Sequence, residues 1–534
     1  MIFSSVTFIF LFLPVTLAVY YLIPDRHLRI RNAFLLLASL FFYWFGEPRF
    51  VFLMAGALVL NWGLTLWMDR KTGTHRKAAF AAIVAGDLSL LFVYKYLGFA
   101  LENLDRLPGM SVAVPETALP VGISFFTFQA LSYVTDVYRK PGSAEKSPVN
   151  VALYISMFPQ LIAGPIVRFG DVAEQIRYRR RDPDLFAWGV CRFIQGLGKK
   201  VIIANTAASA ADAVFGVSAS GTYMGGAVDL TAGLAWVGAV AFAIQIYFDF
   251  SGYSDMAIGL GAMLGFRFRE NFNYPYASDS LTQYWRRWNI SLGTWFRDYV
   301  YIPMGGSRVT TGRHMFNLLV VWLLTGLWHG ASWTFLVWGL YWFALVALEK
   351  LFFEKKGRGL ESRGPGGVAG GLARRSGTSD GRIRESRIAD GVSHNKLAKW
   401  FARHCYIILV MLVGSVIFRS GTLAEAGRYL CSMAGLSDIS GISGTGAVGA
   451  IRTEGALVTG DQLALFLMRE YWYVMLAGAV LSFPVVPAAG KWLKGRLGDR
   501  WYQVISGVAM VLLLVISLSF VIKGGYSPFI YFKF

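Results

Sequence analysis

Cysteine and histidine are both scarce in this 534-residue sequence, which contains three and six of them respectively. Cys191, Cys405 and Cys431 form no CxxC pair and share no metal-ligand spacing with the histidines, so we expect neither a disulfide nor a metal site. P-loop and HExxH patterns are also absent, and GxSxG occurs only as GTSDG at 377–381, without the apolar strand that a nucleophile elbow follows. The sequence therefore lacks the signatures of an α/β-hydrolase nucleophile elbow, a P-loop nucleotide site and a zinc protease.

Charged residues are few as well, at 16% of the chain, whereas 55% is hydrophobic and the mean hydropathy is +0.48. This composition excludes an ordinary soluble domain and indicates an integral membrane protein. Acidic residues are the scarcer kind, 32 against 51 lysines and arginines, which leaves a net charge of +19. The basic residues cluster in short loops between apolar runs. They therefore predict contact with anionic lipids and no nucleic acid partner.

Apolar runs long enough to cross or enter a bilayer recur along the chain. We predict an all-α polytopic membrane protein with roughly 11–13 transmembrane helices, plus re-entrant and amphipathic helices around a central cavity. Basic residues follow the first, third and fifth runs, at 26–31, 70–77 and 139–146. The positive-inside rule places these loops in the cytoplasm and the N-terminus outside. The first run lacks a basic n-region and an A-x-A site, so we expect a retained span and no signal peptide.

Composition divides the chain into three regions. Residues 1–353 are predicted to form the membrane core with the cavity. Residues 354–396 are rich in Gly, Arg and Ser and poor in large apolar residues, which predicts a flexible basic cytoplasmic linker. Residues 397–534 are predicted to form C-terminal transmembrane helices with a polar periplasmic loop at about 420–465.

His329 stands in the middle of LLVVWLLTGLWHGASWTFLVWGLYWFALVAL (318–348), which holds no other ionisable residue. The run is long enough to cross a bilayer, and an ionisable group at membrane depth raises a functional hypothesis. A histidine buried there is neutral and can act as a general base. The alternative is that His329 only hydrogen-bonds a neighbouring helix. The Trp328-His329-Gly330 spelling favours the catalytic interpretation.

Several segments are too polar or too broken to be plain spans. Gln160 lies between two prolines in Phe158–Pro165, and Asp249, Ser251, Tyr253 and Asp255 follow one another within an apolar stretch. Irregular or polar sequence at membrane depth is tolerated where it is buried in protein or lines a cavity, so we expect these residues to line one. The two carboxylates must be paired or neutral, and a structural ion-pair network is favoured over direct catalysis. Their candidate partners are Arg267, Arg269, Arg286 and Arg287.

Residues 284–299, YWRRWNISLGTWFRDY, fit one amphipathic helix with two stripes. The apolar stripe holds Tyr284, Trp288, Leu292, Trp295 and Tyr299, and the polar stripe holds Arg286, Asn289, Gly293 and Arg297. Guanidinium groups suit phosphate, and Gly293 leaves room for a ligand between the arginines. The polar stripe therefore predicts a site for an anionic cofactor. The alternative is an interfacial helix whose arginines reach lipid phosphates.

Four blocks of this sequence carry a resemblance to a known family. They are FPQLIAGPIVRF (158–169), YFDFSGYSDMAIGLGAMLGFRFRENFN (247–273), YWRRWNISLGTWFRDYVYIPMGG (284–306) and TGLWHGASWTFLVWG (325–339). Together they resemble the membrane-bound O-acyltransferases, in particular the bacterial alginate O-acetyltransferase branch. The resemblance covers most of the chain except 354–396 and 420–465.

The resemblance implies a function and a mechanism. Members of this branch sit in the bacterial inner membrane, take acetyl from acetyl-CoA in a cytoplasmic funnel and pass it outward at a histidine, here His329. Trp328 and Ser332 flank that histidine in the same block and are expected to support the cavity. Arg286, Gly293 and Arg297 are expected to bind the CoA phosphates. A periplasmic SGNH-type acetyltransferase or relay protein and a polysaccharide synthesis complex are the implied partners.

One position departs from the pattern of the branch. Where its members usually read WRRWHIS, this chain reads WRRWNIS, with Asn289. Eukaryotic members of the wider superfamily often carry Asn there. A two-histidine mechanism is therefore not available, and we expect the Asn289 amide to donate to the developing oxyanion or to orient the imidazole.

Two alternatives remain open at this point. One is transfer of another acyl group, such as D-alanine, to a cell-wall polymer. The other is a transporter or flippase, which would also need broken helices and a polar residue near the midplane. No inverted repeat relates the two halves of the sequence, which argues against a transporter.

Overall fold

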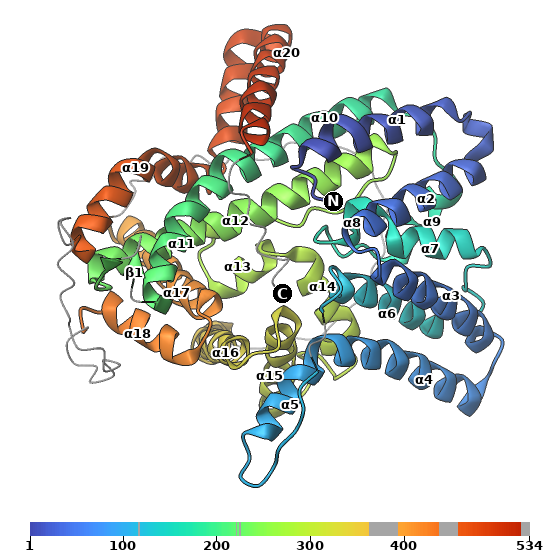
Figure 1. The fold of residues 1–534 in the computed structure, drawn as a ribbon, viewed down its shortest axis with the longest axis horizontal. Helices are drawn as coiled ribbons and strands as arrows, with labels where there is room; N and C mark the ends of the chain where they lie inside the picture. The colour runs from blue at the N-terminus through green and yellow to red at the C-terminus, as the bar shows by residue number, and fades with distance from the viewer. Residues whose placement is uncertain (116–117, 221, 224–225, 362–393, 437–457, 525–534) are drawn as a thin grey trace, which may run out of the picture.

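The structure, a computed structural model, describes residues 1–534 except 116–117, 221, 224–225, 362–393, 437–457 and 525–534. The described chain is almost wholly helical (Figure 1), which confirms the all-α expectation. The exception is a pair of two-residue antiparallel strands, β1 (Thr222–Tyr223) and β2 (Gly226–Ala227).

Most of the N-terminal helices occupy the right-hand side of Figure 1, and α5 lies at the bottom centre. Their bounds are η1 Phe8–Phe12, α1 Leu13–Leu22, η2 Asp25–His27, α2 Leu28–Gly46, α3 Phe50–Asp69, α4 Gly73–Leu91, η3 Phe92–Tyr96, α5 Leu97–Asp105, α6 Ile123–Arg139, α7 Pro148–Ser156, α8 Phe158–Leu161 and α9 Phe169–Arg177.

The remaining helices fill the centre and the left-hand side, with α13 and α14 near the middle of the view. Their bounds are α10 Pro183–Gly198, η4 Lys199–Ala204, α11 Asn205–Ser220, α12 Ala232–Met263, η5 Pro275–Ala277, α13 Leu281–Arg287, α14 Ile290–Phe296, η6 Arg297–Tyr301, α15 Thr311–His329, α16 Trp333–Glu361, α17 His394–Arg419, α18 Leu423–Met433, α19 Gly460–Leu481 and α20 Val485–Ile522.

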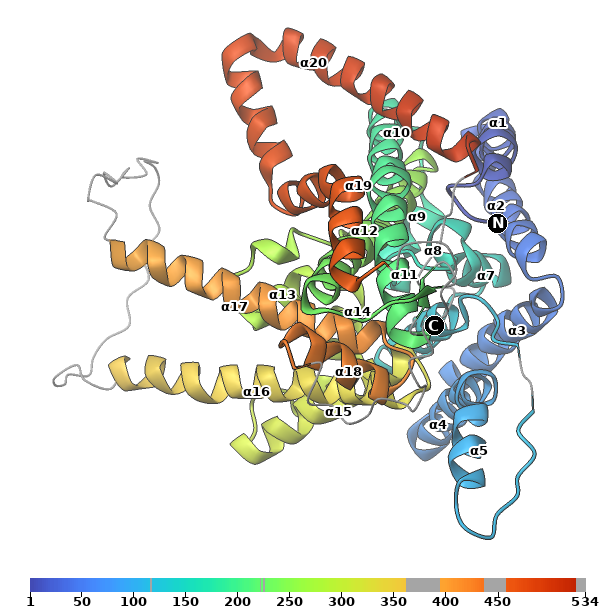
Figure 2. The ribbon, with the colours of Figure 1, turned by 60° about the vertical axis from the view of Figure 1, so that its left-hand side comes forward.

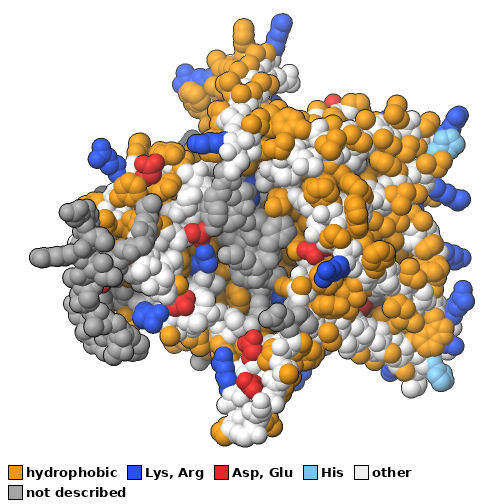
Figure 3. Space-filling model, in the orientation of Figure 1, with side chains coloured by type: hydrophobic (Ala, Val, Ile, Leu, Met, Phe, Trp, Pro, Cys, Tyr) orange, Lys and Arg blue, Asp and Glu red, His pale blue; other side chains and the backbone are white. Residues whose placement is uncertain are grey.

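Nine helical stretches of the described chain are long and apolar enough to cross a membrane, and Phe8–Leu22 adds a shorter apolar helix. The protein is therefore a multi-pass membrane protein, as its composition predicts. Figure 2 shows α15, α16 and α17 projecting together to one side, while α20 arches over the top of the other helices. Apolar side chains cover much of the face in Figure 3, as expected of a surface in contact with lipid.

The basic loops that follow the first, third and fifth apolar runs are neighbours. The backbone N–H groups of Gly142 and Ala144 donate to the carboxylate of Asp69 at the end of α3, at 3.0 and 3.2 Å. In the same region Arg177 pairs with Glu145, and Arg181 pairs with Asp25 in the first loop. Basic side chains gather along the right-hand edge of Figure 3. The three basic loops therefore lie on one side of the protein, as their position after every second apolar run predicts.

Helix α12 is the centre of the fold and is buried along most of its length. It packs against α10 at two reciprocal glycine contacts, Gly196 with Gly252 and Gly189 with Gly259. A Cβ added at any of the four would lie within 2.5–2.8 Å of the opposite carbonyl oxygen. Small residues allow this close approach of helix backbones, which membrane proteins use to gain packing without a hydrophobic driving force.

The carboxylates of α12 are paired, but the expected arginine partners are wrong. Asp249 forms an ion pair with Lys200 at 2.7 Å, and both side chains are at most 2% exposed. Asp255 pairs with Arg192 at 2.8 Å and with Lys199 at 2.7 Å. These cations come from α10 and η4, which pack directly on α12. Of the predicted partners, Arg267 pairs with Asp182 and Arg269 with Asp171, both in the α9–α10 region.

Two predicted irregular regions are partly helical. Helix α16 continues to Glu361 and α17 begins at His394, so only 362–393 of the predicted linker 354–396 falls outside the described residues. Within the predicted loop at 420–465, Thr422 caps α18 by accepting from the N–H of Glu425. Residues 437–457 of that loop also lie outside the described residues.

Breaking the Lys200–Asp249 pair should destabilise the protein. We expect Lys200→Met to lower the free energy of unfolding by about 3–5 kcal/mol, because it leaves a buried carboxylate without its cation. The double variant Lys200→Met/Asp249→Leu should recover most of that loss, since it removes both charges. Thermal unfolding of the purified protein in detergent measures the effect. A double variant that is no more stable than Lys200→Met would contradict this account.

Candidate active site

A cavity of about 490 Å³ lies between the α13–α14–η6 segment and the α15–α16 helix pair. Helix α15 lines it with one face, formed by Leu318, Val321, Trp322, Thr325 and His329. These residues recur at helical spacing, and Leu318 and His329 lie 11 positions apart, or about 16 Å along the helix axis. The cavity is therefore elongated, with His329 at one end of this lining.

His329 is the last residue of α15 and is only 4% exposed. Its ring lies edge-on to Trp338 and Phe418, with centroids 5.0 and 5.1 Å apart, and Phe335 lies near it at 6.4 Å. The imidazole therefore sits in an aromatic pocket that opens on the cavity. Such surroundings exclude water and strengthen any hydrogen bond the ring makes to a substrate.

The end of α15 is held by two side chains that sequence reasoning missed. The Lys95 ammonium donates to the Trp328 carbonyl at 2.5 Å and to the Ser124 hydroxyl at 3.1 Å. The Tyr96 hydroxyl donates to the Leu327 carbonyl at 2.9 Å. Both residues belong to η3, within the apolar stretch Gly73–Asp105. A lysine inside an apolar run was the signal that could have found them.

The predicted single helix over 284–299 is wrong, because the chain breaks at Trp288 and Asn289. Asn289 adopts a left-handed conformation (φ 43°, ψ 57°), which asparagine tolerates better than most residues. The break is pinned by Asn271, whose carbonyl and side-chain oxygens accept from the N–H groups of Ile290 (2.9 Å) and Ser291 (3.1 Å). The apolar residues of the predicted stripe still face the interior, as Tyr284, Trp288 and Leu292 are buried.

The break nevertheless brings the whole predicted polar stripe to one cavity. Arg286, Asn289, Gly293 and Arg297 all line it, together with His329. Asn289 is 6% exposed, and its amide nitrogen makes no hydrogen bond to the described residues. It is therefore available to a ligand. A Cβ added at Gly293 would meet only the Trp285 carbonyl, at 3.9 Å, which leaves the open space that the sequence predicted.

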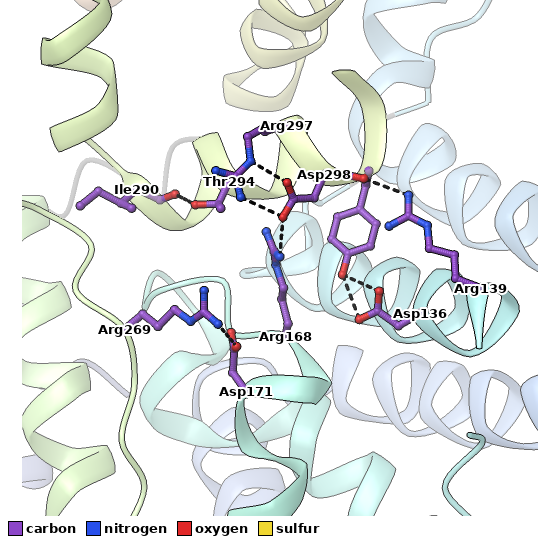
Figure 4. Close-up of polar contacts among 10 residues, drawn as sticks. Asp136, Arg139, Arg168, Asp171, Arg269, Ile290, Thr294, Arg297 and Asp298 are labelled. Atoms are coloured by element: carbon purple, nitrogen blue, oxygen red, sulfur yellow. Dashed lines mark hydrogen bonds and ion pairs between the residues drawn. The ribbon is translucent and has the colours of Figure 1, made fainter. Parts of the chain in front are cut away.

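The other end of the cavity is cationic. Arg286 and Arg297 are exposed there, and Lys350 of α16 adds a third positive charge. Figure 4 shows Asp298 between Arg297 and Arg168, with oxygen–nitrogen distances of 2.6 and 2.7 Å. Burial alone would raise the pKa of Asp298, but the hydrogen bonds from the two guanidinium groups lower it below its usual value. Arg286 makes no ion pair with the described residues and is the freer cation.

The remaining residues expected around the cavity lie elsewhere. Asp249 and Asp255 are held in the α10–α12 ion pairs, and Tyr253 stacks on Phe3 at 4.6 Å. Ser251 is buried in α12, and the Gln160 amide donates to the Tyr154 carbonyl. Trp328 packs on Phe125, and the Ser332 hydroxyl is hydrogen-bonded to that of Thr334. None of these four residues lines the cavity. Polar residues in an apolar run indicated burial correctly, but burial in helix contacts and in the cavity wall look alike in sequence.

Metal ligation has no candidate among the described residues, which hold no group of three or more His, Cys, Asp or Glu side chains close enough to share an ion. Besides hydroxyls and indoles, the cavity wall holds three kinds of polar group. They are an imidazole at the enclosed end, an amide beside it and guanidinium groups at the mouth. This set can take up a proton, donate a hydrogen bond to an oxyanion and bind phosphate.

Comparison with known proteins agrees with this arrangement. The membrane-bound O-acyltransferase family model matches residues 64–354, which include the whole cavity wall. A protein named probable alginate O-acetylase AlgI from Azotobacter vinelandii is 36% identical, with all of both chains covered. One of the same name from Pseudomonas aeruginosa is 45% identical over 66% of each chain. A peptidoglycan O-acetyltransferase from Helicobacter pylori is 34% identical, covering 64% of this chain and 68% of its own.

The family match spans more than half of the chain, and a relative at 36% identity extends over its full length. The aligned region contains His329 and Asn289, which both line the cavity. This chain belongs to the membrane-bound O-acyltransferase family and is a membrane O-acyltransferase.

Proposed function

We propose that this protein transfers an acetyl group from acetyl-CoA to the hydroxyl of a secreted or cell-surface polysaccharide, from the bacterial inner membrane. The observation that carries the proposal is the cavity, which joins a cationic mouth to an enclosed histidine. Relatives named for O-acetylation of alginate or peptidoglycan are more similar to this chain than those named as teichoic acid D-alanyltransferases. Acetyl is therefore the preferred acyl group and D-alanyl the alternative.

The residues of the cavity fit acetyl-CoA. Its phosphates carry the charge that Arg286, Arg297 and Lys350 would neutralise at the mouth. Its pantetheine arm is a thin chain, and the lining of α15 provides about 16 Å between Leu318 and His329. A ligand of this shape would place its thioester near the imidazole while its nucleotide stays outside.

The chemistry assigned to the enclosed end is acyl transfer. His329 takes the proton of the acceptor hydroxyl while that oxygen attacks the thioester carbonyl. Negative charge then develops on the carbonyl oxygen, and the free amide N–H of Asn289 donates to it. When the carbon–sulfur bond breaks, the imidazolium returns the proton to the leaving thiolate. The products are the O-acetyl ester and CoA, and His329 is neutral again.

The charge distribution supports donor entry from the cytoplasm. Arg139, at the end of α6, donates to the backbone carbonyl of Asp298 at 2.9 Å (Figure 4). The mouth is therefore beside the basic loop 139–146, which the positive-inside rule assigns to the cytoplasm. Acetyl-CoA is a cytoplasmic metabolite, so donor and mouth would meet on one side. The acceptor, or a periplasmic SGNH-type protein that relays the acetyl group to a polysaccharide synthesis complex, would approach from the other.

The proposal is tested by His329→Ala. Loss of a general base should lower the rate of acetyl transfer by about 10²–10⁴-fold, while expression and membrane insertion are retained. Purified protein in nanodiscs is given radiolabelled acetyl-CoA and polymer, and both CoA release and polymer acetylation are measured. His75→Ala, at an exposed position in α4, is the matched control. Wild-type protein that releases no CoA would favour the transporter alternative, and an active His329→Ala protein would remove the catalytic assignment.

Asn289 provides a test of the oxyanion donor. Asn289→Gly removes the amide but keeps the left-handed conformation, so kcat should fall roughly 10²–10³-fold with little change in KM. Asn289→His should keep substantial activity, because histidine also tolerates this conformation and its N–H can donate. Asn289→Asp should be poor, since a carboxylate repels the developing oxyanion. Unchanged kcat in the glycine variant would exclude the donor role.

Arg286 provides a test of the phosphate site. A contact made equally to the bound substrate and the transition state alters only substrate binding, so Arg286→Ala should raise the KM for acetyl-CoA roughly tenfold and leave kcat unchanged. Arg297→Ala should have a smaller effect, because Arg297 is already paired with Asp298. High salt should weaken binding in the wild type more than in Arg286→Ala. Arg106→Ala, an exposed arginine outside the cavity, is the control, and an equal KM in all of these proteins would assign the arginines to lipid contact.

A further inference from the structure

We propose that Lys95 and Tyr96 are positioning residues for acyl transfer, which hold the last turn of α15 and thereby fix the imidazole of His329 in the cavity. This inference rests on the proposed function and adds residues to its site. It starts from the backbone at the end of the helix that carries the histidine.

An α-helix leaves the carbonyl groups of its last turn without partners inside the helix. In α15, which ends at His329, the Gly326 carbonyl accepts from the N–H of Gly330 at 3.3 Å. The next two carbonyls, of Leu327 and Trp328, accept from the side chains of Tyr96 and Lys95. Two consecutive residues of η3 thus supply two consecutive acceptors, directly before the histidine.

The charge of Lys95 is directed at this helix end. Lys95 makes no ion pair with a carboxylate in the described parts of the chain, and its acceptors are a backbone carbonyl and the hydroxyl of Ser124. A cation at the C-terminus of a helix is favourable because the macrodipole is negative there. The ammonium also lies 6.0 Å from the ring centroid of Trp328. An ammonium in an apolar helical stretch is costly, and this arrangement is what compensates it.

Lys95 and Tyr96, together called the clamp from here on, also connect three elements. Lys95 lies in the π-helical segment η3 (Phe92–Tyr96), and Ser124 stands in the first turn of α6. π-helical turns inside α-helices are frequent at functional sites. Because α15 ends at His329, any rotation or fraying of its last turn would move the imidazole relative to Asn289 on the opposite wall. A displacement of about 1 Å can cost 10²-fold in rate.

The experiment compares kcat and KM for acetyl-CoA in Lys95→Met, Lys95→Arg and Tyr96→Phe, with polymer saturating. Lys95→Met keeps the length of the side chain without its charge, and kcat should fall about ten- to a hundredfold while KM stays within twofold of wild type. Lys95→Arg should regain much of the rate, because it keeps a cation that can reach the carbonyl. Lys77→Met, exposed near the start of α4, is the control and should be fully active.

The outcomes are separable. Wild-type protein without acetyl transfer would overturn the proposed function, whereas an active wild type with equal kcat in Lys95→Met would overturn the clamp. A fall in kcat together with a rise in KM, with no recovery in Lys95→Arg, would mean that Lys95 serves folding. That outcome would also overturn the proposed positioning role. If Lys95→Met yields no monodisperse protein, Tyr96→Phe decides. It removes one neutral hydrogen bond, so kcat should fall about three- to tenfold at constant KM, and an unchanged kcat would contradict the clamp.

Discussion

Backbone groups inside a membrane protein must find hydrogen-bond partners within the protein, because lipid offers none. Three helix ends meet around the cavity, and each is satisfied by a residue outside its own helix. Lys95 and Tyr96 donate to the carbonyl groups at the end of α15. Glu349 of α16 accepts from the N–H groups of Leu281 and Thr282 at the start of α13. Asn271 does so at the break before α14. These contacts join the walls of the cavity to one another.

The same constraint explains how charge is distributed. Carboxylates of α12 lie deep in the protein and are paired with cations from α10 and η4, which keeps that interior close to neutral. At the cavity mouth the balance is different, since Arg286 and Lys350 are not neutralised by Asp298. The cavity thus has a cationic entrance and a neutral aromatic end around His329. Charged substrate groups are favoured at the first, and charge that develops during reaction is stabilised at the second.

Asn289 shows how a backbone requirement and a chemical requirement fall on one residue. Its left-handed conformation ends α13 and starts α14, and this turn directs the side chain into the cavity wall. Asn and His are both enriched in that conformation among non-glycine residues. Both also carry an N–H that can donate to an oxyanion. An asparagine at position 289 therefore meets the requirement of the turn and also supplies a donor.

The sequence by itself determined the helical membrane class, the family and five residues of the cavity. Composition, apolar run lengths and motifs are local properties, so His329, Asn289, Arg286, Gly293 and Arg297 could be selected without a structure. The prediction of one continuous helix from apolar periodicity failed at Asn289, because a one-residue left-handed turn leaves the spacing of apolar residues almost unchanged.

Only the tertiary structure decided the partners of the buried charges and the fixation of His329. Asp249 was assigned to the wrong cations because its partner lies on a neighbouring helix, at a position set by the packing of α10 against α12. Lys95 lies 233 residues before the carbonyl it binds. Apolar pattern and charge along a chain indicate that a polar group must be compensated, but helix packing in three dimensions selects the group that compensates it.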